Sequence, residues 1–524
     1  MTTSPSEPEP PEFPEFPDHP ELPDHPDGPV HPDHPDQAGH SGIADLAVVG
    51  AGPAGLAATV TAAGLGLRVA LLDAGERPGG QFYRHPAPGL RARRPEALHH
   101  NWRAFADRER RLRAQEAAGR LQYLPAHHVW TVLPEQTLGA RASVWRLHAV
   151  AGPDERAVTV RARAVLLATG AFERQLPFPG WTVPGVVGAG GAQAMLKSGL
   201  VLPGRRVVVA GSGPLLLAVA GSLASAGARI PAVVEAAAYA AYMRRLPVLV
   251  RNPGKLAEGG LHSGALLRHG VRLLTRHAVT AVHGTARVEA VTVARLDRSW
   301  RPLPGTGRTI PCDAVAVGHG LVPQLELATG LGCATRTMSD RTTALQLDNE
   351  QRTSVPGIWS AGETGGIGGA ELALAEGELA ALAIASAAHG IRRPGRIAAL
   401  ARLRDRLRAF ADVMGTVHRP GPGWTAWLDD ATAVCRCEEV PAGLIREAVG
   451  DLGACDARTV KLLTRAGMGW CQGRMCGPAV AALAGEEAAV DRRPLSCPVP
   501  LSHLAELADS ADPGEPAQPR GPAY

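Results

Sequence analysis

The chain has 524 residues, of which 20% are charged and 4% aromatic, and its formal net charge is +4. Its Lys and Arg residues are spread along the sequence without a dense basic block, so nucleic-acid binding is not indicated. The length suits about three domains. The eight cysteines favour metal or redox chemistry over a disulfide framework, because the N-terminus does not resemble a secretory signal.

The first 42 residues repeat Pro, Asp, Glu and His. They are expected to form a disordered, solvated tail, because proline removes backbone donors and little apolar surface is available for a core. Weak binding of a divalent metal by the His/Asp repeats is the alternative. No apolar run reaches the about 18 uncharged residues of a membrane span, and residues 214–228 are expected to form a buried helix instead. We therefore predict no transmembrane segment and a cytoplasmic location.

The globular part begins near Ile43 with a strand, a glycine turn and a helical pattern. The turn has the G-x-G-x-x-G spacing, which allows close approach of the backbone to a pyrophosphate at the helix N-terminus. A second apolar run ends at Asp73, which is placed to accept a ribose hydroxyl. This order predicts a dinucleotide site, and a glycine-rich turn without a ligand is the alternative. The candidate binding residues are Gly50, Ala51, Gly52, Pro53, Ala54, Gly55 and Asp73, with Gly80 and Gln81 in the loop that follows.

Further along, residues 98–119 have helical spacing and are expected to form a surface helix. Residues 129–132, 144–147 and 158–160 alternate like strands of a small antiparallel sheet. Residues 164–168 form a separate, fully apolar strand that suits the central sheet and is closed by Thr169 and Gly170.

With this A-T-G turn, the sequence resembles the flavoprotein disulfide reductases, which have two dinucleotide domains and hold FAD in the first. The resemblance implies that Thr169 and Gly170 lie near FAD. It also implies that Gly362 and Glu363 bind the ribityl chain, with Glu in place of the usual Asp. Gly369 and Ala370 open an apolar helix over residues 372–387, whose N-terminus would face the pyrimidine end of the flavin.

A second unit of the same kind carries Gly211 and Gly213, and its next strand ends at Glu235. The resemblance places NAD(P)H here, but Leu216 occupies the third glycine position, where overpacking typically costs about 1–3 kcal/mol unless the turn opens. Glu235 suits a ribose 2′-hydroxyl and repels a 2′-phosphate. NAD, another nucleotide or no ligand all remain open for this domain.

No C-x-x-C motif is present, so dithiol–disulfide exchange is not expected. Cys312 and Cys333 are expected to be buried as small hydrophobes. His319 follows an apolar strand; an acid–base role and a structural role are both open.

The C-terminal region carries Cys435 and Cys437 as C-x-C and, after 33 further residues, Cys471 and Cys476 as C-x4-C. Four clustered thiolates can surround a zinc ion or a 2Fe–2S cluster, and a metal-free structural role is the alternative. The pattern resembles the small helical 2Fe–2S domain of bacterioferritin-associated ferredoxin (BFD). With residues 467–478 it resembles the large flavin subunits of opine oxidase, hydrogen cyanide synthase and the heteromeric proline and hydroxyproline dehydrogenases. Cys455 and Cys497 lie outside the pattern.

The predicted fold is α/β, with two Rossmann-like dinucleotide-binding domains and a small, mainly α-helical BFD-like 2Fe–2S domain. The expected segments are the tail (1–42), the FAD domain in two parts (43–180 and 311–390), the second Rossmann domain (181–310), a helical linker (391–430), the 2Fe–2S domain (431–490) and a C-terminal tail (491–524).

The resemblance implies an electron-transfer component of a heteromeric dehydrogenase for a D-amino acid, an opine or hydroxyproline. Its partners would be a glycine-oxidase-like FAD subunit plus a small ferredoxin-like subunit. No catalytic residue is predicted, since no Ser/His/Asp or Lys/Glu set is recognisable. A stand-alone NADH-dependent FAD/2Fe–2S reductase and an iron–sulfur regulator are the alternatives.

Overall fold

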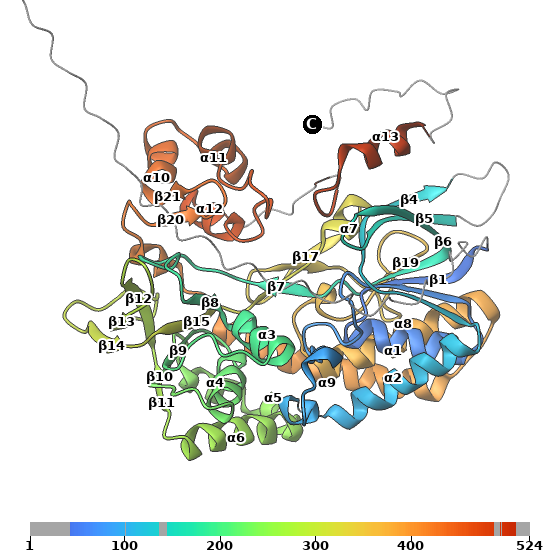
Figure 1. Cartoon of the computed structure of the whole chain (residues 1–524), viewed down its shortest axis with the longest axis horizontal. Coiled ribbons are helices and arrows are strands. Elements are labelled where there is room, and N and C mark those ends of the chain that lie inside the picture. The colour runs from blue at the N-terminus through green and yellow to red at the C-terminus, as the bar shows by residue number, and fades with distance from the viewer. Residues whose placement is uncertain (1–41, 100, 136–143, 487–492, 494, 510–524) are drawn as a thin grey trace, which may run out of the picture. The chain divides into compact units, whose positions relative to one another are not determined.

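The computed structural model describes residues 42–99, 101–135, 144–486, 493 and 495–509 (Figure 1). The predicted N-terminal tail lies outside these residues except for Gly42. Within them, the chain forms two sheets built around parallel strands, the helices that cover these sheets, and a small helical module near the C-terminus. This agrees with the predicted α/β class.

The first sheet has the strand order β3-β2-β1-β6-β5-β4, with β19 also paired to β6. The central strand β1 runs parallel to β2 and β6. Residues 46–49 are buried, as a continuous apolar run predicts for a strand covered on both faces. The strands are β1 (Ala44–Val49), β2 (Val69–Leu72), β3 (Leu121–Leu124), β4 (His127–Glu135), β5 (Val144–Ala151), β6 (Arg156–Leu167) and β19 (Ile358–Ser360).

The strand β6 corrects one prediction. The sequence predicts residues 158–160 and 164–168 in separate sheets, which is wrong, because both belong to β6. No glycine or proline interrupts this stretch. Its first half pairs antiparallel with β5, and its buried last residues pair parallel with β1 and β19. The antiparallel strands therefore extend the central sheet.

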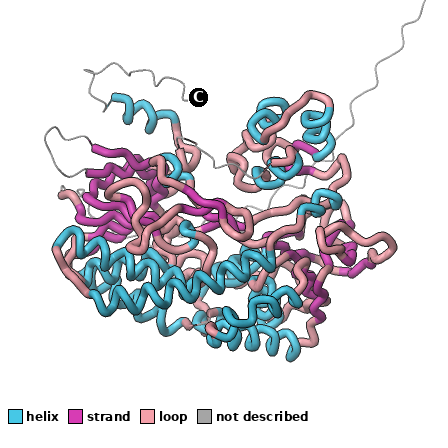
Figure 2. Tube along the Cα trace, turned by 180° about the vertical axis from the view of Figure 1, so that it is seen from behind, coloured by secondary structure: helices cyan, strands magenta, loops and turns pink. Residues whose placement is uncertain are grey.

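Four long helices lie beside this sheet, three of them in contact with its strands and the fourth packed on one of those three, and Figure 2 shows long helices gathered along one side of the strands. They are α1 (Pro53–Gly64), α2 (Trp102–Ala117), α8 (Ala370–His389) and α9 (Pro394–His418). By length and composition alone α8 could cross a membrane, which differs from the expectation that no apolar run is long enough. However, 67% of its apolar window is buried, as in the core helix of a folded domain.

The second sheet is parallel, with the order β11-β10-β9-β15-β8. Since β15 pairs with β9 and β8, this sheet continues beyond residue 310, where the sequence predicts the second domain to end. The strands are β8 (Val186–Gly188), β9 (Val207–Gly211), β10 (Ala232–Glu235), β11 (Arg272–Thr275) and β15 (Ala314–Gly318). The helices are α3 (Ala189–Gly199), α4 (Leu215–Ser225), the 3-10 helix η3 (Tyr239–Arg245), α5 (Leu246–Val250) and α6 (Pro253–Arg268).

Short elements join these parts. An antiparallel sheet is formed by β12 (His277–His283), β13 (Ala290–Arg295) and β14 (Arg308–Pro311). Smaller pairs are β7 (Ala171–Glu173) with β16 (Leu321–Pro323), and β17 (Thr335–Thr337) with β18 (Thr343–Leu345). The remaining short helices are η1 (Pro88–Leu90), η2 (Pro95–Leu98), α7 (Glu326–Gly330), η4 (Glu363–Gly365) and η5 (Pro422–Trp427).

The C-terminal module contains the hairpin β20 (Ala433–Cys435) and β21 (Val440–Pro441), followed by α10 (Ala442–Gly450), α11 (Ala457–Thr464) and α12 (Gly477–Leu483). Its helices are grouped in Figure 1, and α13 (Leu501–Asp509) follows them. The module shares one hydrophobic cluster with the second domain, through Trp181, Trp300 and Trp427. The indole of Trp181 donates to the carbonyl of Ala433 at 2.6 Å.

Candidate functional site

The glycine turn between β1 and α1 is shaped for a close ligand. Gly50 has a φ of +104°, and a Cβ on Gly55 would lie 1.8 Å from its carbonyl oxygen. Glycine is therefore required at both positions. At Gly52 a Cβ would meet nothing within 4 Å, so the turn is open beside the N-terminus of α1. A phosphate can approach the backbone here.

Asp73 stands beside this turn, where the sequence predicts the ribose acceptor. Its carboxylate accepts the N–H groups of Ala51 and Gly75, each at 3.0 Å. Burial raises the pKa of this carboxyl, although both N–H groups act in the opposite direction. The side chain remains half-buried. Gly80 also lies at the turn, since a Cβ there would be 2.8 Å from the Cα of Gly52. Gln81 is exposed.

Two later segments reach the same turn. A Cβ on Gly50 would lie 2.4 Å from the carbonyl oxygen of Ala168, which precedes Thr169 and Gly170. A Cβ on Gly362 would lie 3.0 Å from that of Ala54. The Thr169 hydroxyl donates within the protein, to the carbonyl of Gln324 at 2.8 Å. The fold thus gathers sequence-distant predicted residues at one edge of the sheet.

Glu363, which the resemblance assigns to the ribityl chain, binds the backbone of its own loop. Its carboxylate accepts the N–H groups of Gly368 at 2.6 Å and Gly369 at 3.0 Å, next to Ala370 at the start of α8. Burial raises its pKa, against the two backbone N–H groups. The Glu363 carboxylate therefore binds the backbone of the glycine run that leads into α8.

A buried ion pair that the sequence did not reveal supports this edge. Glu376, 1% exposed within α8, accepts the N–H of Gly362 at 3.0 Å. Arg408 of α9 approaches Glu376 at 2.7 Å and also donates to the carbonyl of Gly366. Glu376 and Glu378 inside the otherwise apolar run of residues 372–387 were the available signal, since buried carboxylates are normally paired.

The second glycine turn, between β9 and α4, repeats the first with one difference. Gly211 has a φ of +136°, and a Cβ there would lie 1.7 Å from the carbonyl oxygen of Gly318. Leu216 is 1% exposed and packs in the core between strands and helices. The helix begins at Leu215, one residue after Pro214, whereas α1 begins directly at its proline.

Glu235 ends β10 in the position that corresponds to Asp73. Its carboxylate accepts the N–H groups of Gly213 at 3.1 Å and Ala237 at 2.9 Å. Unlike Asp73, it has no exposed surface. His418, the last residue of α9, places its Nδ1 atom 3.5 Å from Oε1 of Glu235. The second turn therefore has its acid covered by the chain itself.

The four cysteines of the C-x-C and C-x4-C motifs lie together, with Cys435 at the end of β20. Cys435 and Cys476 are buried, whereas Cys437 is exposed. The Cys476 thiol interacts with those of Cys435 and Cys471, and the Cys437 thiol with those of Cys471 and Cys435. Gly467 points its N–H at the Cys435 sulfur at 3.5 Å. The predicted ligands are thus brought together in one set.

The set supplies four thiols. Among the residues that the structure describes, no group of three or more His, Cys, Asp or Glu could hold one metal ion. A 2Fe–2S cluster takes two thiolates at each iron, and the four thiols match that number. Burial, followed by the neighbouring thiols, raises the pKa of Cys476. Nearby cations would stabilise its thiolate.

His319, the other candidate from the sequence, does not indicate a functional site. His319 is 3% exposed and its ring lies 6.1 Å from that of Trp300 and 5.8 Å from that of Trp427. Burial lowers its pKa to about 3, which fits a neutral structural histidine.

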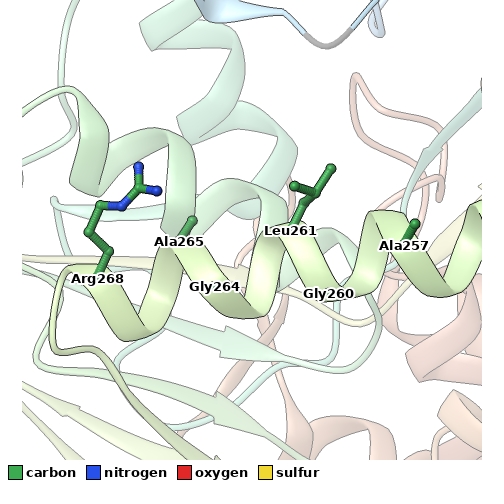
Figure 3. A pocket seen from close by; sticks show the side chains of 6 residues that line it. All are labelled: Ala257, Gly260, Leu261, Gly264, Ala265 and Arg268. Carbon is green, nitrogen blue, oxygen red and sulfur yellow. The ribbon is translucent and has the colours of Figure 1, made fainter.

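A hollow along α6 is lined by one face of that helix, shown in Figure 3, and Arg268 is its one charged side chain. Cys312 and Cys333 are buried, as predicted.

The comparisons with known proteins agree with this architecture. The family described as pyridine nucleotide-disulphide oxidoreductase matches residues 44–377, and the BFD-like 2Fe-2S binding domain matches residues 433–486.

Individual proteins match over most of the chain. The HcnB component of hydrogen cyanide synthase from Pseudomonas aeruginosa is 36% identical over 82% of this chain and 90% of its own. An opine oxidase subunit from Agrobacterium tumefaciens is 36% identical over 83% of this chain and 84% of its own. The crystal structure of L-proline dehydrogenase from P. horikoshii is similar in fold, with a TM-score of 0.58 and 20% identity over 88% of this chain and 79% of that chain.

Proposed function

This chain belongs to the pyridine nucleotide-disulphide oxidoreductase family, in the group of HcnB and the opine oxidase subunit, and from that premise we propose that it is the electron-transfer subunit of a heteromeric amino or imino acid dehydrogenase. It is a flavin-dependent oxidoreductase whose cofactors are FAD and a 2Fe–2S cluster. Its relatives are subunits of multi-subunit enzymes.

We assign the FAD to the first glycine turn and its neighbours. The N-terminus of α1 beside Gly52 would face the pyrophosphate, and Asp73 would accept the ribose hydroxyls. Thr169, Gly170 and Gly362 would line the flavin side of the turn, where two of these segments already contact residues 50–54. Glu363 would bind the ribityl chain beside the glycine run whose N–H groups it accepts.

The four-cysteine set is the observation that most directly supports the proposed electron-transfer role. Flavin handles two electrons and a 2Fe–2S cluster handles one at a time, which suits a relay between a two-electron donor and a one-electron acceptor. Cys435 and Cys476 anchor the set inside the module, while the exposed Cys437 marks its solvent side. A partner protein can therefore approach the cluster from that side.

The substrate would bind in another chain. By resemblance, a glycine-oxidase-like partner with its own flavin oxidises the C–N bond of a D-amino acid, an opine or hydroxyproline, which releases two electrons and two protons. The electrons pass to this chain, and a small ferredoxin-like subunit completes the complex. We place this complex in the cytoplasm, where thiols stay reduced and available to iron.

Expression with and without the partner tests the proposal. The holoprotein alone should oxidise none of these substrates with an artificial dye as acceptor. Co-purification with the glycine-oxidase-like subunit should restore dye reduction. Substantial oxidation of an amino or imino acid by this chain alone would contradict the assignment.

A further inference from the structure

The two glycine turns provide an internal comparison. In each, the acid at the end of the second strand accepts two backbone N–H groups: Ala51 and Gly75 for Asp73, Gly213 and Ala237 for Glu235. The backbone arrangement is therefore the same. The difference lies in the rest of each carboxylate, which is where a ribose would bind.

At Glu235 that space is filled by the end of α9. His418 lies 3.5 Å from the carboxylate through Nδ1, and its Nε2 atom lies 2.5 Å from the hydroxyl of Tyr242. The hydroxyl of Ser212, inside the glycine turn, donates to the carbonyl of His418 at 3.0 Å. The ring of Tyr239 is 5.9 Å from the imidazole, and Tyr239 also interacts with the carboxylate. Hydrogen bonds therefore hold both the imidazole and the backbone carbonyl of His418 in place.

We propose that His418 occupies the adenosine-ribose position of the second dinucleotide site and thereby closes that site to NAD(H). A ribose needs hydrogen bonds to the acid that ends the second strand, and Glu235 has no surface left to offer. His418 is thus a specificity-determining residue that keeps nicotinamide cofactors from competing with the electron donor of this flavoprotein.

The obstruction is confined to the ribose position. A Cβ on Gly213 would meet nothing within 4 Å, so the turn itself remains open for phosphates. Leu216, which the sequence suggested as the obstacle, is packed inside the core. Removal of the imidazole should therefore uncover the side of the carboxylate that His418 covers, while Tyr239 keeps its own interaction with Glu235.

NADH binding to the FAD- and cluster-loaded full chain is the test. Titration calorimetry should detect no saturable binding by the wild type. His418→Ala should bind NADH at least tenfold more tightly, and adding Glu235→Gln to that variant should abolish the gain. His389→Ala, at the exposed end of α8, is the matched control and should behave like the wild type.

Two results would overturn the inference. One is saturable NADH binding by the wild type that Glu235→Gln weakens, a measurement that does not need the His418 variant to fold. The other is a folded His418→Ala protein, shown by retained FAD, that gains no NADH affinity. Neither bears on the proposed partner, which dye assays with the glycine-oxidase-like subunit test separately.

Discussion

At the scale of single residues, the glycine of the first turn makes a sharp prediction. Gly55→Ala should lower FAD content and destabilise the protein by at least about 1–3 kcal/mol, because its Cβ would lie 1.8 Å from a backbone oxygen. Flavin absorbance per protein and thermal unfolding measure both effects. Gly64→Ala, in the same helix but with nothing within 4 Å of its Cβ, should retain FAD.

The cysteines make a second prediction at this scale. Cys435→Ser and Cys476→Ser should each lose the cluster, because either change removes a buried ligand. Iron analysis and visible absorbance check the loss. Cys455→Ser changes an exposed cysteine outside the set and should keep the iron of the wild type. Equal iron in all three variants would refute the ligand assignment.

Residues fixed by local backbone geometry could be predicted from the sequence, and residues brought in from afar could not. The glycines at 50, 52 and 55 have a recognisable spacing because one tight turn requires them together. His418 bonds Ser212 across 206 positions, so its place depends on the length and direction of α9. No local sequence pattern predicts this contact between His418 and Ser212.

At the scale of elements, the packing of α9 on α8 depends on a buried ion pair. Arg408→Ala leaves the Glu376 carboxylate buried without its cation and should destabilise the protein by about 3–5 kcal/mol near neutral pH. Arg396→Ala removes an exposed pair to Glu378 between the same helices and should cost at most about 1 kcal/mol. Denaturant unfolding compares the two variants.

The same pair predicts a pH dependence. Burial already raises the pKa of Glu376, and Arg408 limits the rise, so Arg408→Ala should raise it further. A raised pKa in the folded state means that stability is lost as pH increases through that pKa. The deficit of Arg408→Ala relative to wild type should therefore be larger at about pH 8 than at about pH 5. Glu376→Gln in the same chain should remove this difference.

Long, strongly periodic elements were predictable, whereas strand pairing was not. The helices expected over residues 98–119 and 372–387 correspond to α2 and α8. The extent of β6 was missed because alternating and continuous apolar patterns meet in it without a break. Its neighbours, rather than its own residues, decide which half is covered on both faces.

At the scale of the whole molecule, the four-cysteine module is held against the second domain by tryptophans. The ring of Trp427 lies parallel to that of Trp300 at 6.2 Å, and its indole donates to the carbonyl of Trp300 at 2.8 Å. The backbone between His418 and this contact is short, so the module and the covered second turn are tied to the same stretch of chain. The sequence predicts both domains but not this junction, because its partners are 127 positions apart.

Trp427→Ala tests whether this junction holds the module in place. The change removes a buried ring and its hydrogen bond and should cost about 3–5 kcal/mol. The first glycine turn is built from other elements, so FAD content should be unchanged, while proteolysis between residues 419 and 432 should become faster. Trp470→Ala, whose side chain is 81% exposed, should leave proteolysis as in the wild type. Unchanged proteolysis of a folded, destabilised Trp427→Ala protein would show that other contacts hold the module, and loss of FAD would show that the two parts unfold together.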